Sequence, residues 1–127
     1  MKLRCVKNSL RLRVKKSDLQ QLNTEGIITE TVAFGGQQLF AFALAISEMH
    51  GEVTAEFLDN LIIVQLPTDS AQTWIHSNEV GIEVQNQLDN GESLHILVEK
   101  DFPCLDRENE DKSDTFFELA TKKPDAC

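Results

Sequence analysis

Short runs in which apolar and polar residues alternate are the feature that most constrains this chain. The runs 2–6 and 10–15 alternate on either side of the turn Lys7-Asn8-Ser9, which predicts a β-hairpin. Further short runs, separated by turn or capping residues, follow at 27–33, 39–46, 53–58, 61–66, 80–84 and 94–99. The chain is therefore expected to consist mainly of about eight β-strands.

The alanine-rich segment 39–49 is compatible with a helix by composition, because Gly51 could cap a helix that ends there. Its large and small residues nevertheless alternate strictly: Phe40, Ala41, Phe42, Ala43, Leu44, Ala45 and Ile46. A strand would place the large residues on one side and the alanines on the other, whereas a helix would scatter them. The pattern predicts a strand over 39–46.

Two short helices are predicted between these strands. Ser17-Asp18-Leu19-Gln20 has the pattern of a capping box and opens a helix to about residue 23, and Pro67-Thr68-Asp69 opens a second helix to about residue 76. The order ββαββ thus occurs twice, in residues 1–50 and 51–102. Leu10, Ser17 and Asp18 correspond to Leu61, Thr68 and Asp69 at a shift of 51 positions.

The predicted fold class is α+β, mostly β, in a single domain over 1–102. Two similar four-stranded half-sheets would bury their apolar faces against each other, either as a sandwich or as a pseudo-twofold barrel. Trp74 in the second helix and Cys5, which alternates with Leu3, are expected to be core residues.

The stretch after Asp101 differs in composition, because acidic residues crowd it ahead of Phe116-Phe117: Asp106, Glu108, Glu110, Asp111 and Asp114. We expect residues 103–127 to form a partly disordered acidic tail. This tail could fold back on the basic first hairpin, with Phe116 and Phe117 as its apolar anchor.

Basic residues are concentrated at the N-terminal end. Seven of the 12 Lys and Arg residues precede position 17, where no acidic residue occurs, and positions 17–99 hold 13 Asp and Glu but no Lys or Arg. Alternation places Arg11, Arg13 and Lys15 on one face of a strand, and Lys2 and Arg4 could share that face across the hairpin. Either these cations form cross-strand ion pairs with acidic strands, or they form a surface that holds an anion.

The sequence contains none of the motifs GxSxG, HExxH, GxxxxGK[ST] and GxGxxG, which lowers the expectation of an enzyme. His50, His76 and His95 are isolated and do not have the spacing of a helical metal pair. His95 and Cys104, with Glu99 or Asp101, are minor candidates for a transition-metal site or an activated thiolate. No cofactor and no metal are predicted.

The leading hypothesis is therefore a non-catalytic binding module that contacts an anionic small molecule or an acidic protein surface through Arg4, Arg11, Arg13 and Lys15. The alternative is a small enzyme that acts on a phosphorylated or carboxylated metabolite inside a barrel, with Glu52, Glu56 or Glu83 as acid, base or metal ligand. A homodimer held by the basic face is a third possibility. Nucleic acid is disfavoured by the net charge of −9 and by the lack of aromatic residues among the cations.

Residues 39–46 are the longest apolar stretch, and these eight residues fall well short of the ~18 that a membrane span needs. The N-terminus has no apolar segment typical of a secretory signal peptide. Three cysteines without a CxxC pair also argue against a disulfide framework or a zinc site. We expect a cytoplasmic protein that does not associate with membranes.

Four segments resemble the signatures of a small uncharacterised bacterial single-domain family: 1–13, Phe34-Gly35-Gly36-Gln37, Val80-Gly81-Ile82-Glu83 and 98–105. The resemblance covers nearly the whole chain. Because that family has no assigned activity, the resemblance implies a complete single-domain bacterial protein and carries over no catalytic residue.

Overall fold

The computed structural model describes residues 1–102, 114, 116 and 119. Its helices and strands are β1 (Lys2–Val6), β2 (Ser9–Val14), α1 (Lys16–Glu25), β3 (Ile27–Gly35), β4 (Gln38–Ile46), β5 (Thr54–Leu58), β6 (Leu61–Leu66), α2 (Thr68–Ile75), β7 (Gly81–Gln87) and β8 (Ser93–Lys100). The predicted mostly β fold with eight strands and two short helices is confirmed, as is the strand over 39–46. The predicted acidic tail lies almost entirely outside the described residues.

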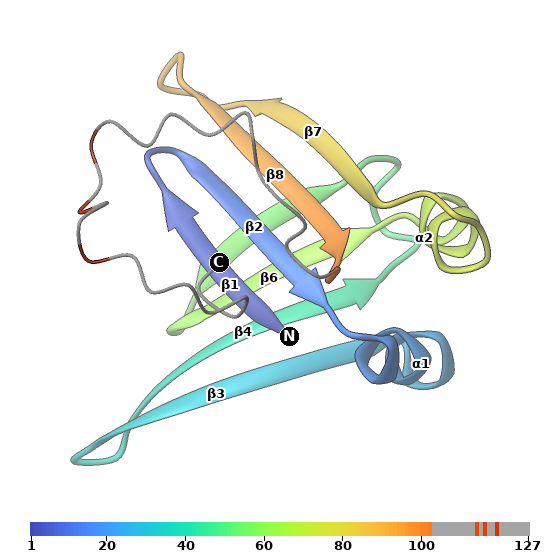
Figure 1. Ribbon diagram of the computed structural model, residues 1–127. Coiled ribbons are helices and arrows are strands. Elements are labelled where there is room, and N and C mark those ends of the chain that lie inside the picture. Colours follow the sequence, from blue (N-terminus) through green and yellow to red (C-terminus); the bar gives the residue numbers. More distant parts are fainter. Residues whose placement is uncertain (103–113, 115, 117–118, 120–127) are drawn as a thin grey trace.

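The strands form two four-stranded sheets, with the orders β1-β2-β8-β7 and β3-β4-β6-β5. Each sheet consists of two antiparallel hairpins joined by one central parallel pair, β2 with β8 and β4 with β6. The sheets face each other as a sandwich, and both helices lie at the same end of it (Figure 1). They are not closed into a barrel, because β1, β7, β3 and β5 are edge strands of separate sheets. The barrel alternative was therefore wrong.

Each half of the chain contributes one hairpin to each sheet. The β1-β2 hairpin belongs to the first sheet, α1 follows it, and the β3-β4 hairpin belongs to the second sheet; α2 connects β5-β6 to β7-β8 in the opposite direction. The expectation that each half forms a sheet of its own was wrong, because each helix carries the chain across from one sheet to the other. The two halves are therefore interleaved through a common core.

Three pairs of backbone hydrogen bonds show that the halves are structural repeats. The bond from His95 N to Asn8 O in the first sheet corresponds to the bond from Ala41 N to Asn60 O in the second. In the same way, the bond from Asp101 N to Val14 O corresponds to that from Ser47 N to Leu66 O. The bond from Lys100 N to Val80 O corresponds to that from Ile46 N to Gly26 O. The first hairpin therefore repeats 52 positions later, as from Asn8 to Asn60, and the second 54 positions later, as from Gly26 to Val80. The predicted shift of 51, which rested on Leu10, Ser17 and Asp18, is one position shorter than the observed shift of the first hairpin.

The core lies between the sheets and extends beneath the helices. Leu12 and Val14 of β2 and their repeats Val64 and Leu66 of β6 are all buried. Leu22 of α1 and Trp74 of α2 occupy equivalent positions and are both fully buried. The prediction that Trp74 is a core residue is therefore confirmed. Its indole Nε1 donates to Val80 O at 3.1 Å. No helix in the described part of the chain is long and apolar enough to cross a membrane.

The N-cap of helix α1 lies two residues earlier than predicted. Its N-cap is Lys15, and Asp18 Oδ2 accepts a hydrogen bond from Lys15 N at 2.9 Å. The capping box predicted at Ser17 and Gln20 was therefore wrong. The Asp18 carboxylate also pairs with the Met1 amine at 3.0 Å, and Glu30 Oε1 contacts the same amine at 3.1 Å.

Candidate functional site

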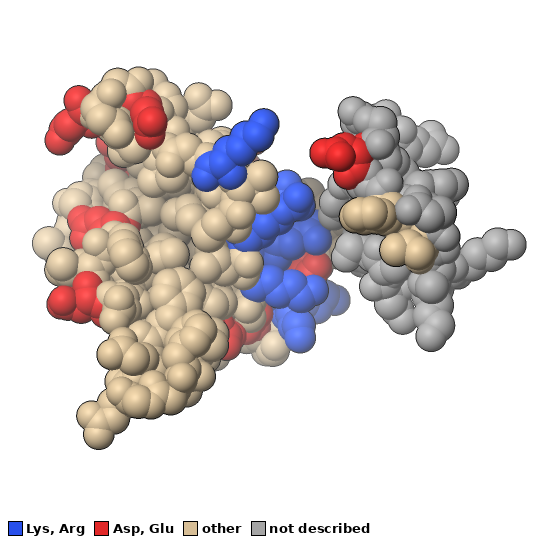
Figure 2. All heavy atoms as spheres, turned by 90° about the vertical axis from the view of Figure 1, so that its left-hand side faces the viewer, with Lys and Arg blue, Asp and Glu red and all other residues tan. Residues whose placement is uncertain are grey.

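The cations of the first hairpin lie on one face. In the antiparallel β1-β2 pair, Lys2 is opposite Arg13 and Arg4 is opposite Arg11, so that these four side chains share the outer face of their sheet. We call them the basic strip. The alternating residues, including Leu12 and Val14, face the core. Figure 2 shows Lys and Arg side chains gathered together on one side of the molecule.

Glu99 of β8 lies beside this strip because β8 runs parallel to β2 and places Glu99 opposite Arg13. Arg13 Nε donates to Glu99 Oε1 at 2.7 Å, and Arg11 Nε lies 3.7 Å from the same oxygen. Glu99 is only 9% exposed. The ion-pair interpretation of the basic residues therefore holds for Arg13 and, at a longer distance, for Arg11.

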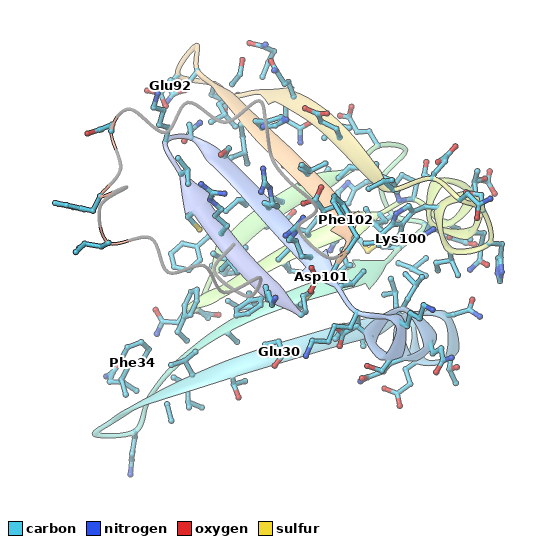
Figure 3. The ribbon with its side chains drawn as sticks, in the orientation of Figure 1. Glu30, Phe34, Glu92, Lys100, Asp101 and Phe102 are labelled. Carbon is cyan, nitrogen blue, oxygen red and sulfur yellow. The ribbon has the colours of Figure 1, made fainter. Side chains whose placement is uncertain are left out.

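Asp101 and Phe102, which follow β8 directly, complete the surroundings of the strip (Figure 3). Lys2 Nζ donates to Asp101 Oδ2 at 3.2 Å, and Arg13 NH1 lies 3.7 Å from Asp101 Oδ1. The Arg13 guanidinium also lies 5.1 Å from the centre of the Phe102 ring, within the range of a cation–π interaction. Arg13 is thus held on three sides.

The four cations of the basic strip have two carboxylate partners within the described residues, Glu99 and Asp101. Arg4 has no carboxylate within 4.0 Å in that part of the chain. Among the described residues, the cations of the strip therefore outnumber the carboxylates beside them. Its individual members differ: Arg13 is nearly covered, with 15% of its side chain exposed, whereas 65% of the Lys2 side chain is exposed.

Of the predicted site residues, Arg4, Arg11 and Arg13 come together on this face, but Lys15 does not extend the strand. It is the N-cap of α1 and lies with Lys16 at the helix end of the strip, where both are exposed. Asp101 and Phe102 were not predicted as neighbours of Arg13, because the parallel pairing of β2 with β8 joins segments 86 positions apart. No local pattern reveals such a pairing.

The minor candidates do not form a cluster. His95 Nε2 contacts Glu83 Oε1 across the β7-β8 pair, while Cys104 lies outside the described residues. Within the part of the chain that the structure describes, no group of three or more His, Cys, Asp or Glu residues could hold a metal ion. Glu52 precedes β5, and Glu56 lies on the other sheet, so they do not face the basic strip.

A cleft of about 320 Å³ opens between the two sheets at the end opposite the helices. Its lining is mostly apolar, with Leu10, Phe40, Ile62 and Leu94 inside and Lys7, Asn8 and Glu56 among the polar residues around it. Cys5 also lines this cleft and is exposed. The prediction that Cys5 is a core residue was therefore wrong: its side chain faces inward, but the sandwich is open at this end.

These features define a duplicated two-sheet sandwich that carries a basic strip on the outer face of one sheet. The model of a family described as Family of unknown function (DUF7009) matches residues 1–119, and the chain belongs to that family. The resemblance to an uncharacterised family is thereby confirmed. No curated protein and no solved structure matches the chain.

Proposed function

We propose that this chain is a binding protein whose basic strip holds an acidic segment of a partner protein. The observation that carries the proposal is the register of β1 with β2, which aligns Lys2, Arg4, Arg11 and Arg13 on one outer face of the sheet. Only two carboxylates of the described residues, Glu99 and Asp101, lie beside them. Such an excess of positive charge favours an anionic partner.

The spacing of the strip suits an extended peptide. Residues two apart in a strand, such as Arg11 and Arg13, are separated by about 6.6 Å, and this is also the spacing of alternate side chains in an extended acidic segment. Because the strip is on the outer surface of a sheet rather than in a cavity, a protein segment matches it better than a small molecule does.

The members of the strip have different roles in this proposal. Arg13 is already held by Glu99 and Phe102 and acts as a positioning residue that keeps β2 and β8 together. Lys2, Arg4 and Arg11 are the contact residues, and the exposed Lys15 and Lys16 extend the positive surface toward α1. The alternative of an enzyme inside a barrel finds no support, because the sheets are not closed and the cations lie on an outer face.

The proposal can be tested with the full chain and a fluorescently labelled oligoglutamate peptide, with binding followed by anisotropy at several salt concentrations. The double variant Arg4→Gln/Arg11→Gln is expected to bind about tenfold more weakly and to show a smaller salt dependence. Lys100→Gln is the control, because it removes a cation that is not part of the strip and whose Nζ donates to Ser77 O just after α2.

Equal affinities of the wild type and the double variant would contradict the proposal. Displacement of the peptide by inorganic phosphate at similar concentrations would identify a small anion, rather than an acidic protein segment, as the ligand that the strip prefers.

A further inference from the structure

We propose that two copies of this chain associate through the outer face of the β3-β4-β6-β5 sheet. The strand registers place the following residues on this face, which we call the alanine face: Ile27, Thr29, Thr31, Ala33, Leu39, Ala41, Ala43, Ala45, Thr54, Glu56, Leu58, Leu61, Ile63 and Gln65. Among them only Glu56 is charged. Ala43 is 1% exposed but lies outside the hydrophobic core cluster, as expected for a small residue flanked by larger neighbours on an outer face.

Comparison with the other sheet shows how unusual this face is. The repeat relates Arg11 to Ile63, Arg13 to Gln65 and Glu99 to Ala45, and it likewise relates Lys2 to Thr54 and Glu83 to Thr29. At these five positions one outer face carries charged side chains and the other carries uncharged ones, whereas Arg4 corresponds to Glu56, the one charged residue of the alanine face. Since an outer sheet face in water is normally polar, the loss of charge indicates that this face is covered.

Two polar atoms on the same face support a partner. Thr54 and Gln65 are directly opposite each other in the β5-β6 pair, and Thr54 Oγ1 and Gln65 Oε1 are shielded from solvent without a hydrogen-bond partner in the described residues. A shielded polar group without a hydrogen-bond partner destabilises the fold. Rotation of either side chain toward a second molecule would provide the missing hydrogen bond.

A second copy fits this face because a twofold contact brings each surface against itself. Such an isologous contact is unfavourable for a charged face, where like charges meet, and favourable for an uncharged one. The small residues Ala41 and Ala43 at the centre allow two sheets to approach closely. In the C-terminal segment, the described apolar residues Phe116 and Leu119 are exposed and therefore do not cover this face.

The available area indicates a reversible dimer. Four strands about 4.8 Å apart and about 20–25 Å long present roughly 400–500 Å² each, or about 1,000 Å² for two copies. This value is at the lower limit for a specific protein interface, so the dimer is expected to dissociate in the micromolar range.

Sedimentation velocity of the full chain from about 1 to about 300 μM tests the proposal. The wild type is expected to change from monomer to dimer over this range, with no loosening in high salt because the contact has few charges. Ile63→Arg is expected to remain monomeric at every concentration. The fold should tolerate it, because Glu56 lies opposite position 63 and arginine occupies the equivalent position 11.

Arg11→Gln is the matched control on the opposite sheet and is expected to dimerise like the wild type. A wild type that stays monomeric at the highest concentration would overturn the proposal. So would a dimer that survives Ile63→Arg, or one that dissociates in salt and is lost in Arg11→Gln, because each would place the contact elsewhere. Since the basic strip lies on the other outer face, its peptide binding and this dimer can fail independently.

Discussion

Arg13 and Glu99 lie opposite each other in the parallel β2-β8 pair, and Arg13 Nε donates to Glu99 Oε1 at 2.7 Å. Although Glu99 belongs to the outer face of the sheet, only 9% of the residue is exposed. The repeat has Gln65 and Ala45 at the equivalent positions of β6 and β4. The two central parallel strand pairs thus have the same backbone pairing, but only the β2-β8 pair carries an ion pair between its side chains.

Removing the carboxylate of Glu99 is expected to destabilise the fold. In Glu99→Ala the nearly covered Arg13 guanidinium loses its closest partner, and this should lower the free energy of unfolding by about 2–3 kcal/mol. Urea denaturation followed by tryptophan fluorescence measures the change, because Trp74 is fully buried.

Glu83→Ala is the control for this prediction, since it removes a carboxylate from the same face. The Glu83 side chain is 63% exposed, so the loss should stay below about 1 kcal/mol. Similar losses in the two variants would mean that burial does not distinguish these ion pairs.

The Met1 amine and the Asp18 carboxylate predict how stability depends on pH. Burial lowers the pKa of the Met1 amine, but the hydrogen bonds and charges of Asp18 and Glu30 outweigh it and raise the pKa above 8.0. Burial raises the pKa of Asp18, but the Lys15 N–H and the Met1 amine outweigh it and hold the pKa below 3.8. In a chain that begins at Met1, the pair therefore stabilises the fold fully between about pH 4 and pH 8.

This contribution should be lost in two directions. Below about pH 4 it falls as Asp18 is protonated, and above about pH 8 it falls as the Met1 amine loses its proton. Because Met1 and Asp18 are half-buried residues, each limb should amount to less than about 1 kcal/mol. Melting temperatures measured against pH should show both limbs flattened in Asp18→Asn. Acetylation of the Met1 amine should flatten the alkaline limb, and an unchanged alkaline limb would contradict this assignment.

The order of the strands and helices could be predicted from the sequence because it depends on local signals. The alternation of large residues with Ala41, Ala43 and Ala45 identifies β4 as a strand, and turn residues bound the hairpins. How the halves combine could not be predicted, because the β2-β8 and β4-β6 pairings join distant segments and depend on the direction in which each helix carries the chain.

The candidate site was predictable to the same extent. That Arg11 and Arg13 share a face follows from the period of a strand, and their register with Arg4 and Lys2 follows from a short turn. Glu99 and Phe102 as neighbours of Arg13 depend on the parallel pairing and therefore required the structure. Lys15 departs from the strand because Asp18, three positions later, fixes its backbone as a helix N-cap.

Gly81 is expected to be essential to the packing of β7 on β8. It pairs with Glu99, and a Cβ at position 81 would lie 2.6 Å from Val98 O and 3.1 Å from Glu99 Cβ. Gly81→Ala should therefore displace β7 and lower the free energy of unfolding by about 1–3 kcal/mol. Gly51→Ala, where a Cβ meets no atom within 4 Å, should change it by less than about 0.5 kcal/mol. Equal stabilities of the two variants would show that β7 accommodates the added Cβ without a loss of stability.

The repeat also predicts what is needed to build the Arg13-Glu99 pair into the other sheet. Ala45→Glu with Gln65→Arg supplies the two charges, but Ile27 is opposite Ala45 where Gly81 is opposite Glu99. We expect the Ile27 side chain to crowd a glutamate at position 45, so the double variant should be less stable than the wild type. Adding Ile27→Gly should restore part of that loss, although Ile27→Gly alone is destabilising because glycine disfavours strands.

The measurement is urea denaturation of the wild type, the Ile27→Gly variant, the double variant and the triple variant. A favourable coupling of about 1 kcal/mol between Ile27→Gly and the pair of charges is expected. Simple additivity of the substitutions would mean that the space opposite position 45 does not decide whether an ion pair can form there. In that case a steric limit inside the sheet would not explain why the alanine face lacks the ion pair of the other sheet.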